Sequence, residues 1–178
     1  MHQRKYALEL ISVSGLGAAK SFHTPIDISV KLTTREYDQH LKETIDQQDK
    51  QASKKTACEE DEVLQDQSAH QRIIGKLLYL TVTRPNISYS VQNLSEFLQQ
   101  PKRSYMEAHL RIIRYIKSHP GKGILLSSNR QDTITAYYDA DWAACLFSRK
   151  SITGFLIKLG DSLVSWKSKK QSIISRSS

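Results

Sequence analysis

The chain has 178 residues, which at roughly 150 residues per domain corresponds to one domain or two small ones and excludes a large multidomain enzyme. Hydrophobic residues make up 39% of the sequence and charged residues 25%, as in globular proteins, so a wholly disordered chain and a membrane protein are also excluded. The 26 lysines and arginines outnumber the 18 aspartates and glutamates, and the net charge of +8 favours polyanionic partners such as nucleic acid or an acidic membrane surface.

Cysteine content and apolar runs indicate a compartment. Cys58 and Cys145 are too few for a disulfide framework and form no Cys-x-x-Cys pair, which favours a reducing environment. Glu9 interrupts the amino-terminal apolar stretch, so no secretory signal is expected, and the apolar run at 77–82 is too short to cross a bilayer. We expect an intracellular protein of the cytoplasm or nucleus that does not bind membranes.

Charge is distributed unevenly along the chain. Residues 34–66 carry 5 basic and 10 acidic side chains and few large apolar ones, whereas residues 101–178 carry 14 basic and 5 acidic side chains, a net charge of +9. The first stretch is typical of a flexible linker with a frayed helix, and we place an acidic linker at 34–67. A polyanion is expected to bind the carboxyl-terminal region.

Apolar periodicity predicts helices on both sides of this linker. Residues 3–13 form a short helix that glycines end. After the linker, Ser68 and Gln71 have the spacing of a capping box, and apolar residues then recur every three to four positions until Arg84-Pro85. The same spacing predicts a second helix from residue 87 to Pro101.

A third helix and a sheet complete the expected fold. Ser104 and Glu107 form another capping box, and the apolar face that follows ends at residues 119–121. Short apolar runs then predict four strands, of which the last two form a hairpin around Gly160-Asp161. These strands are expected at residues 124–126, 133–138, 154–159 and 163–167. Helices followed by an antiparallel sheet define an α+β fold.

Two groups of side chains are candidates for chemistry. Asp139 and Asp141 point the same way on an extended chain and together could bind a divalent metal ion, although an aspartate pair that closes a strand is commonly part of a turn. Arg111, Arg114 and Lys117 share one face of the third helix. That face is either a solvated polar surface or a set of phosphate contacts.

Four motifs together resemble the Pol polyprotein of copia-type retrotransposons. They are GKLLYLTVTRPNI at 75–87, RIIRYIK at 111–117, DADWA at 139–143 and SWKSKKQ at 165–171. Their order and spacing also match that family, and residues 3–10 and 24–25 extend the resemblance over nearly the whole chain. Asn86 stands where the family usually has Asp.

The resemblance implies a division of the chain. Residues 1–33 correspond to the end of a reverse-transcriptase palm, 68–128 to its helical thumb and connection, and 129–178 to the start of an RNase H domain. The resemblance thus implies an α+β fold in which a helical thumb and connection segment is followed by an incomplete RNase H-like antiparallel sheet. The thumb resemblance favours phosphate contacts for Arg111, Arg114 and Lys117, and Lys167, Lys169 and Lys170 are further nucleic-acid contacts.

The resemblance also implies which catalytic groups are missing. Asp139 takes the position of the first RNase H aspartate of the family, with Asp141 as a weak second metal ligand. The family uses Mg²⁺, but two-metal phosphoryl transfer needs several converging carboxylates. The polymerase motif Tyr-x-Asp-Asp is absent, and no Asp-Asp pair occurs anywhere in the sequence. No cofactor is therefore expected in this fragment.

The sequence predicts a catalytically inactive fragment of a copia-type reverse transcriptase and RNase H polyprotein that retains non-specific binding to RNA or DNA. A first alternative is a piece of an intact RNA-directed DNA polymerase and RNase H enzyme. A second is a non-catalytic interaction module or effector, which no targeting signal or Arg-x-Leu-Arg segment supports. The oligomeric state and the host do not follow from these residues.

Overall fold

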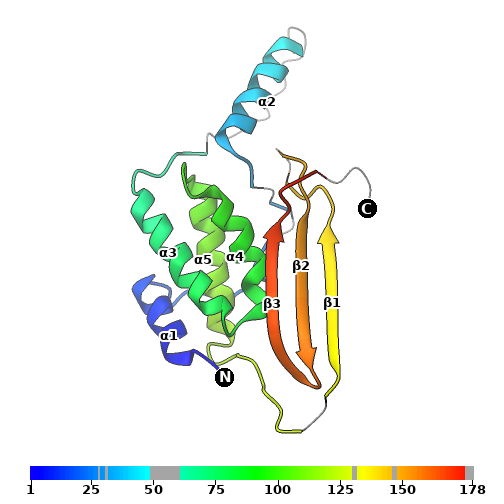
Figure 1. Cartoon of the computed structure of the whole chain (residues 1–178). Helices are drawn as coiled ribbons and strands as arrows, with labels where there is room; N and C mark the ends of the chain where they lie inside the picture. Colours follow the sequence, from blue (N-terminus) through cyan, green and yellow to red (C-terminus); the bar gives the residue numbers. More distant parts are fainter. Residues whose placement is uncertain (28, 31, 49–60, 130–131, 146–147, 175–178) are drawn as a thin grey trace.

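The structure, a computed structural model, describes residues 1–27, 29–30, 32–48, 61–129, 132–145 and 148–174. Within these ranges, five α-helices and two short 3₁₀ helices precede a three-stranded antiparallel sheet (Figure 1), so the α+β fold class is confirmed. The helical elements are α1 (Arg4–Val13), α2 (Arg35–Gln48), α3 (Gln67–Thr81), η1 (Pro85–Ile87), α4 (Ser88–Leu94), η2 (Ser95–Phe97) and α5 (Arg103–Ser118). The strands are β1 (Ile134–Asp141), β2 (Ile152–Leu159) and β3 (Ser162–Lys170). No helix of the described residues is long and apolar enough to cross a membrane.

The hydrophobic core lies between α1, α3, α4 and α5. It is made of apolar residues on the facing sides of these helices, and all of them are almost fully buried. The members of this cluster are Ala7, Leu10, Ile11, Leu77, Leu80, Ile87, Val91, Leu94, Tyr105, Ile112, Ile113 and Ile116. The helices expected at 3–13, after the linker and around 104–118 are confirmed.

The helix starts differ from the predicted capping boxes. Asp66 caps α3 by accepting a bond of 2.9 Å from the amide of Ala69, so Ser68 lies inside the helix. At α5, the Ser104 amide donates to Asp61, which is 43 residues away in sequence. Glu107 pairs instead with Arg103. Both capping-box predictions were wrong, because Asp66, the residue directly before α3, accepts a free amide of that helix, and Asp61, far away in sequence, accepts one of α5.

The helix predicted from residue 87 to Pro101 is shorter than expected. Only Ser88–Leu94 is α-helical, between the 3₁₀ helices η1 and η2. The preceding helix α3 ends at Thr81, and Arg84 lies directly before η1. The buried guanidinium of Arg84 donates to the carbonyl of His119 at the end of α5. Because Arg84 donates to a free carbonyl at the carboxyl terminus of α5, it holds α5 against the connection between α3 and η1.

The sheet has the order β1–β2–β3, and all of its pairs are antiparallel. Gly160 adopts a positive φ of 55° in the turn between β2 and β3, which confirms the predicted hairpin. A bulge between Ile157 and Lys158 shifts the register of this hairpin. The strand predicted at 124–126 is wrong: Ile124 exchanges backbone hydrogen bonds with Met1, and these residues form no strand.

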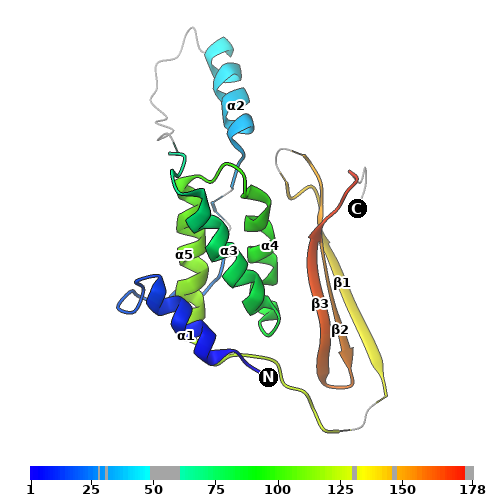
Figure 2. The same ribbon diagram turned by 60° about the vertical axis from the view of Figure 1, so that its left-hand side comes forward.

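The two faces of the sheet have different surroundings. Helices lie on one side (Figures 1 and 2), and we call that side the inner face and the opposite side the outer face. Three bonds join the inner face to the helices: the indole of Trp166 donates to the carbonyl of Thr81, Tyr89 donates to Asp141, and Lys170 pairs with Glu96. The outer face carries exposed apolar and basic side chains.

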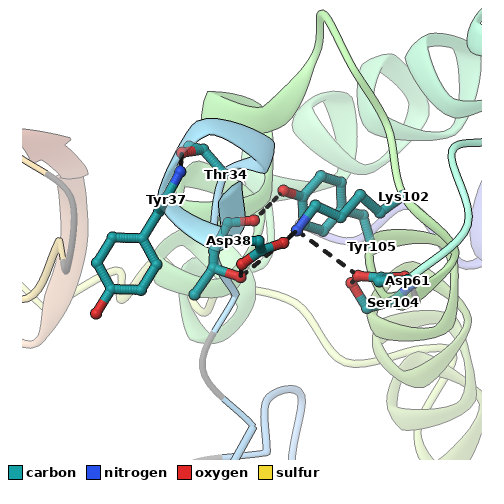
Figure 3. A network of polar contacts seen from close by, with 8 residues as sticks. Thr34, Tyr37, Asp38, Asp61, Lys102, Ser104 and Tyr105 are labelled. Atoms are coloured by element: carbon teal, nitrogen blue, oxygen red, sulfur yellow. Dashed lines mark hydrogen bonds and ion pairs between the residues drawn. The ribbon is translucent and has the colours of Figure 1, made fainter. Parts of the chain in front are cut away.

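The acidic stretch begins with α2, which extends away from the other helices in both views (Figures 1 and 2). The ammonium of Lys102, of which 2% of the residue surface is exposed, pairs with Asp38 and lies 3.9 Å from Asp61 (Figure 3). The other end of the acidic stretch is attached to the start of α5 by backbone hydrogen bonds, in which the Leu64 amide donates to Pro101 and the Arg103 amide donates to Glu62. Residues 49–60, in the middle of the predicted linker, lie outside the described residues.

Candidate functional site

Asp139 and Asp141 lie at the end of β1 on the inner face of the sheet. Their strand partners on β2 are Gly154 and Ile152, and residues two apart on a strand share a face, as the sequence indicated. One oxygen of Asp139 accepts the amide of Ala140 at 2.8 Å, which is a local turn-like contact. Asp141 accepts the hydroxyl of Tyr89 at 2.9 Å.

A cleft of about 790 Å³ opens between this end of the sheet and the helices. Its walls come from residues 26–27, 30, 32–34 and 37, from α4 and η2, and from the connection after β1. Besides the two aspartates it contains Glu96, and the guanidinium of Arg149 lies 5.8 Å from the ring of Trp142. Burial, together with Asp141, raises the pKa of Tyr89 to about 12, so this hydroxyl stays a proton donor at neutral pH.

The carboxylates of this cleft do not fit a two-metal centre. Within the described part of the chain, no three His, Cys, Asp or Glu side chains come together in a way that could hold a metal ion. Glu96 is bound to Lys170 at 2.7 Å, and Asp141 is bound to Tyr89. Two-metal phosphoryl transfer requires more converging oxygen ligands than Asp139 and Asp141 supply.

Arg111, Arg114 and Lys117 all contact their own chain. The ammonium of Lys117 donates to three backbone carbonyls of residues 16–19 at 2.6 to 3.2 Å. Arg114 donates to the carbonyl of Lys20 at 2.6 Å. Both guanidinium groups lie over the ring of Phe22, at 4.5 Å for Arg111 and 4.0 Å for Arg114.

These three residues therefore hold the connection after α1 against α5. Arg111 also forms an ion pair of 3.1 Å with Asp27 and donates to Thr24. These side chains do not form a purely solvated surface, because their partners are carbonyls, a ring and a carboxylate of the same chain. A phosphate could reach these cations only by competing with those contacts. Their assignment to nucleic acid stays a prediction.

Lys167, Lys169 and Lys170 divide between the two faces of β3. Lys167 and Lys169 are exposed on the outer face. Lys170 points to the inner face, where it donates to Glu96 and to the sulfur of Cys145 at 3.0 Å. Because neighbouring residues of a strand alternate, the basic run in the sequence becomes two separate environments.

The sheet places two aromatic side chains beside the exposed lysines. Tyr138, Phe155 and Lys167 are direct neighbours across β1, β2 and β3, and directly paired residues share a face. Tyr138 is 86% exposed and Phe155 is 39% exposed. Sequence reasoning did not select these two aromatics. The alternation of β1 and β2 was the available signal, but the hairpin bulge hid the register with Lys167.

No protein-family model and no solved structure matches this α+β chain. The chain is 33% identical over its whole length to the retrovirus-related Pol polyprotein from transposon RE1 of Arabidopsis thaliana, of which it covers 10%. It is 29% identical over its whole length to an uncharacterized mitochondrial protein of the same plant, AtMg00810, of which it covers 64%. Over 59% of its length it is 38% identical to the secreted RxLR effector protein 161 of Plasmopara viticola, of which it covers 75%.

The helical region with its following antiparallel sheet is thus a segment of a much longer type of protein. The chain belongs to the family of retrovirus-related Pol polyproteins from copia-like transposons. It spans about a tenth of the length of the RE1 and RE2 polyproteins that it matches.

Proposed function

We propose that this Pol segment has no polymerase or RNase H activity and binds single-stranded nucleic acid, without sequence preference, on the outer face of its sheet. The helical part would then derive from a thumb and connection and the sheet from the start of an RNase H domain. The observation that carries the proposal is the row of Tyr138, Phe155 and Lys167 across the three strands.

This row combines the two interactions that single-stranded nucleic acid needs. Exposed aromatic rings stack on bases of any sequence, and basic side chains neutralise the phosphates. Lys169 lies two residues beyond Lys167 on the same face, in a carboxyl-terminal region with a net charge of +9. Since the α5 cations are occupied by their own chain, the exposed lysines of β3 are the better phosphate contacts.

The absence of polymerase and RNase H activity is inferred from the small number of carboxylates at the end of β1. Asp139 and Asp141 are the two acidic side chains at the end of β1, and the described residues supply no third ligand to them. The net positive charge of the chain favours the binding of nucleic acid, but it cannot hold two metal ions in position.

Two other functions have a specific observation in their favour. The relatives RE1 and RE2 are Pol polyproteins, which favours a piece of an intact polymerase and RNase H enzyme. A relative named as a secreted effector favours a non-catalytic interaction module. Contiguous coding sequence on both sides would support the first, and a protein partner that binds without nucleic acid would support the second.

Binding is tested with fluorescently labelled, unstructured RNA and DNA 20-mers of two different sequences. We expect similar affinities for both sequences and a loss of about fivefold to a hundredfold when Tyr138→Ala removes one stacking ring. Tyr79→Ala, at an exposed tyrosine of α3, is the matched control and should leave affinity unchanged. Equal affinity of the wild type and the Tyr138→Ala variant would exclude the outer face.

Catalytic silence is tested with magnesium or manganese, a primed RNA template and an RNA–DNA hybrid. The purified chain should neither extend the primer nor cut the RNA. Asp139→Asn separates true activity from a contaminating nuclease. Activity that disappears in this variant would show that the chain is catalytic.

A further inference from the structure

A smaller cavity of about 300 Å³ lies between the sheet and the η1–α4 segment, and Tyr138, Phe155 and Lys167 of the proposed stacking row are also among the residues that line it. Pro85 and Tyr89 form its wall on the side of η1 and α4. Tyr137, Leu156 and Trp166, one from each strand and neighbours across the sheet, form the opposite wall. The cavity is therefore open, and flat and apolar side chains from the sheet and from the η1–α4 segment make up most of its lining.

The cavity exists because one position of the sheet has no side chain. Gly154 lies between Asp139 and Ser168 in the next row of the inner face. A Cβ atom placed on Gly154 would meet no other atom within 4 Å. The glycine thus leaves room that a larger residue could fill without a clash at its Cβ, and this gives a direct way to close the cavity.

Two hydroxyls in the cavity wall have no partner. Ser168 is 7% exposed, and its buried oxygen makes no hydrogen bond. The buried oxygen of Ser88, on the opposite wall, also makes none. A buried polar group without a partner costs about 1–3 kcal/mol, so a ligand that bonds to both hydroxyls would recover that free energy.

The remaining groups define the ligand class. Asp139 and Lys167 also line the cavity, and the carboxylate of Asp139 accepts hydrogen bonds from a ligand. The indole of Trp166 is held by its bond of 2.8 Å to Thr81 and offers a fixed surface for stacking. A flat ring with donors and acceptors on its edge satisfies the walls, the two hydroxyls and the carboxylate together, whereas an aliphatic ligand would leave the hydroxyls unpaired.

We propose that this cavity binds a nucleobase, either as a free nucleoside or as an unpaired base of a strand. Bases with an exocyclic amino group are preferred over uracil, because that group can donate to Asp139. Tyr138, Phe155 and Lys167 line both this cavity and the proposed stacking surface, whereas Ser88, Gly154 and Ser168 line the cavity alone. Variants at these last three positions therefore test this inference separately from the proposed function.

The test uses tryptophan fluorescence of the Trp142→Phe variant, in which Trp166 is the single remaining tryptophan. Adenosine and uridine are titrated separately, and an oligoadenylate supplies the base within a strand. We expect saturable quenching by adenosine or by the oligoadenylate, with weaker binding of uridine. Quenching by free adenosine identifies the nucleoside as a ligand, and quenching by the strand alone identifies the unpaired base.

Gly154→Val in the same background should abolish quenching by filling the cavity. Gly17→Val is the matched control, because a Cβ atom on Gly17 would also meet open space, but Gly17 lies outside the sheet. Ser168→Ala, which leaves the cavity open, should weaken binding about tenfold because one hydrogen bond is removed. Lys169→Ala, at an exposed lysine of the outer face that does not line the cavity, should leave adenosine binding unchanged, whether or not it alters binding of RNA on the outer face.

Three results would overturn the inference: no saturable quenching by any of the three probes, binding that persists unchanged in Gly154→Val, or equal affinity of Ser168→Ala and the wild type. In each case the cavity holds water and nothing else. Thermal melting of the variants by circular dichroism shows whether they are folded, and if Gly154→Val does not fold, Ser168→Ala with Ser88→Ala decides the question.

Discussion

The rings of His70 and His109 lie side by side inside the helical core, with centroids 4.6 Å apart and both residues fully buried. Neither nitrogen of His109 has a hydrogen-bond partner. Burial, and to a smaller extent His70, lowers the pKa of His109 to about 3, and burial also lowers the pKa of His70. Both rings are therefore neutral in the folded protein at pH 7.

This pair predicts a loss of stability in acid. An unfolded histidine takes up a proton near its ordinary pKa of about 6.5, so the stabilisation is complete above that pH and is lost as the pH falls toward 3. For His109 alone the free energy of unfolding should fall by about 2 kcal/mol between pH 7 and pH 5. Urea unfolding of the wild type and of His109→Leu measures this loss, and the variant should lack it. His23→Leu, at an exposed position, should behave like the wild type, and identical pH profiles for His109→Leu and the wild type would contradict the assignment.

Lys102 is the residue that connects both ends of the acidic stretch to α5. Its side chain is almost completely buried, whereas its partners Asp38 and Asp61 are partly exposed. We expect Lys102→Met to lower the free energy of unfolding by about 2 kcal/mol, less than for a fully buried pair, because water can still solvate the two carboxylates. Urea unfolding measures the change, and Lys122→Met at an exposed site is the control. A Lys102→Met variant as stable as the control would show that the pair contributes nothing.

At the scale of elements, the acidic stretch should be the first site of proteolysis. A polar segment with few apolar residues gains too little from burial to offset its ordering entropy. Trypsin could cut after the lysines at 42, 50, 54 and 55, of which the last three lie outside the described residues. Because Asp38 and Asp61 both pair with Lys102, the two fragments should stay together in native size-exclusion chromatography. Protection of all four sites, read by mass spectrometry, would show that the stretch is packed.

The sheet depends on the helices for the cover of its inner face. Trp166 and Lys170 bond to α3 and η2, while the outer face and most of β1 are exposed. A three-stranded sheet without a covering layer is marginal in water and offers its edges to other chains. Residues 120–178 alone should therefore aggregate or remain unfolded. A monomeric fragment with dispersed amide resonances and a cooperative melt would contradict this.

The helices and the hairpin followed from local patterns, which explains why they could be predicted. The apolar positions of α1, α3 and α5 repeat at helical spacing, and the turn at Gly160-Asp161 lies between two apolar runs. The cap of α5 could not be predicted, because Asp61 reaches Ser104 only through the folded chain. The cap of α3 is local, since Asp66 directly precedes that helix. The site was predicted in part: the alternation of a strand placed Asp139 and Asp141 together.

The rest of the site depends on contacts between distant elements. The sequence showed that Arg111, Arg114 and Lys117 share a helix face, but not that residues 16–27 cover it. In the same way, the row of Tyr138, Phe155 and Lys167 could be predicted only from the register of both strand pairs. The bulge in the hairpin altered that register. Charge counts identify a basic region, whereas the fold decides which of its cations remain exposed.

For the whole molecule, the central claim is that nucleic acid binds on the outer face through exposed lysines of β3. The most direct test is the slope of log affinity against log salt concentration for a single-stranded RNA. Removing one lysine that neutralises a phosphate should reduce the magnitude of that slope by about 0.7, so Lys167→Ala with Lys169→Ala should reduce it by about 1.4. The pair Lys5→Ala and Lys122→Ala, exposed lysines outside the sheet, should leave the slope unchanged. A slope that stays the same in the Lys167 and Lys169 double variant would contradict the claim.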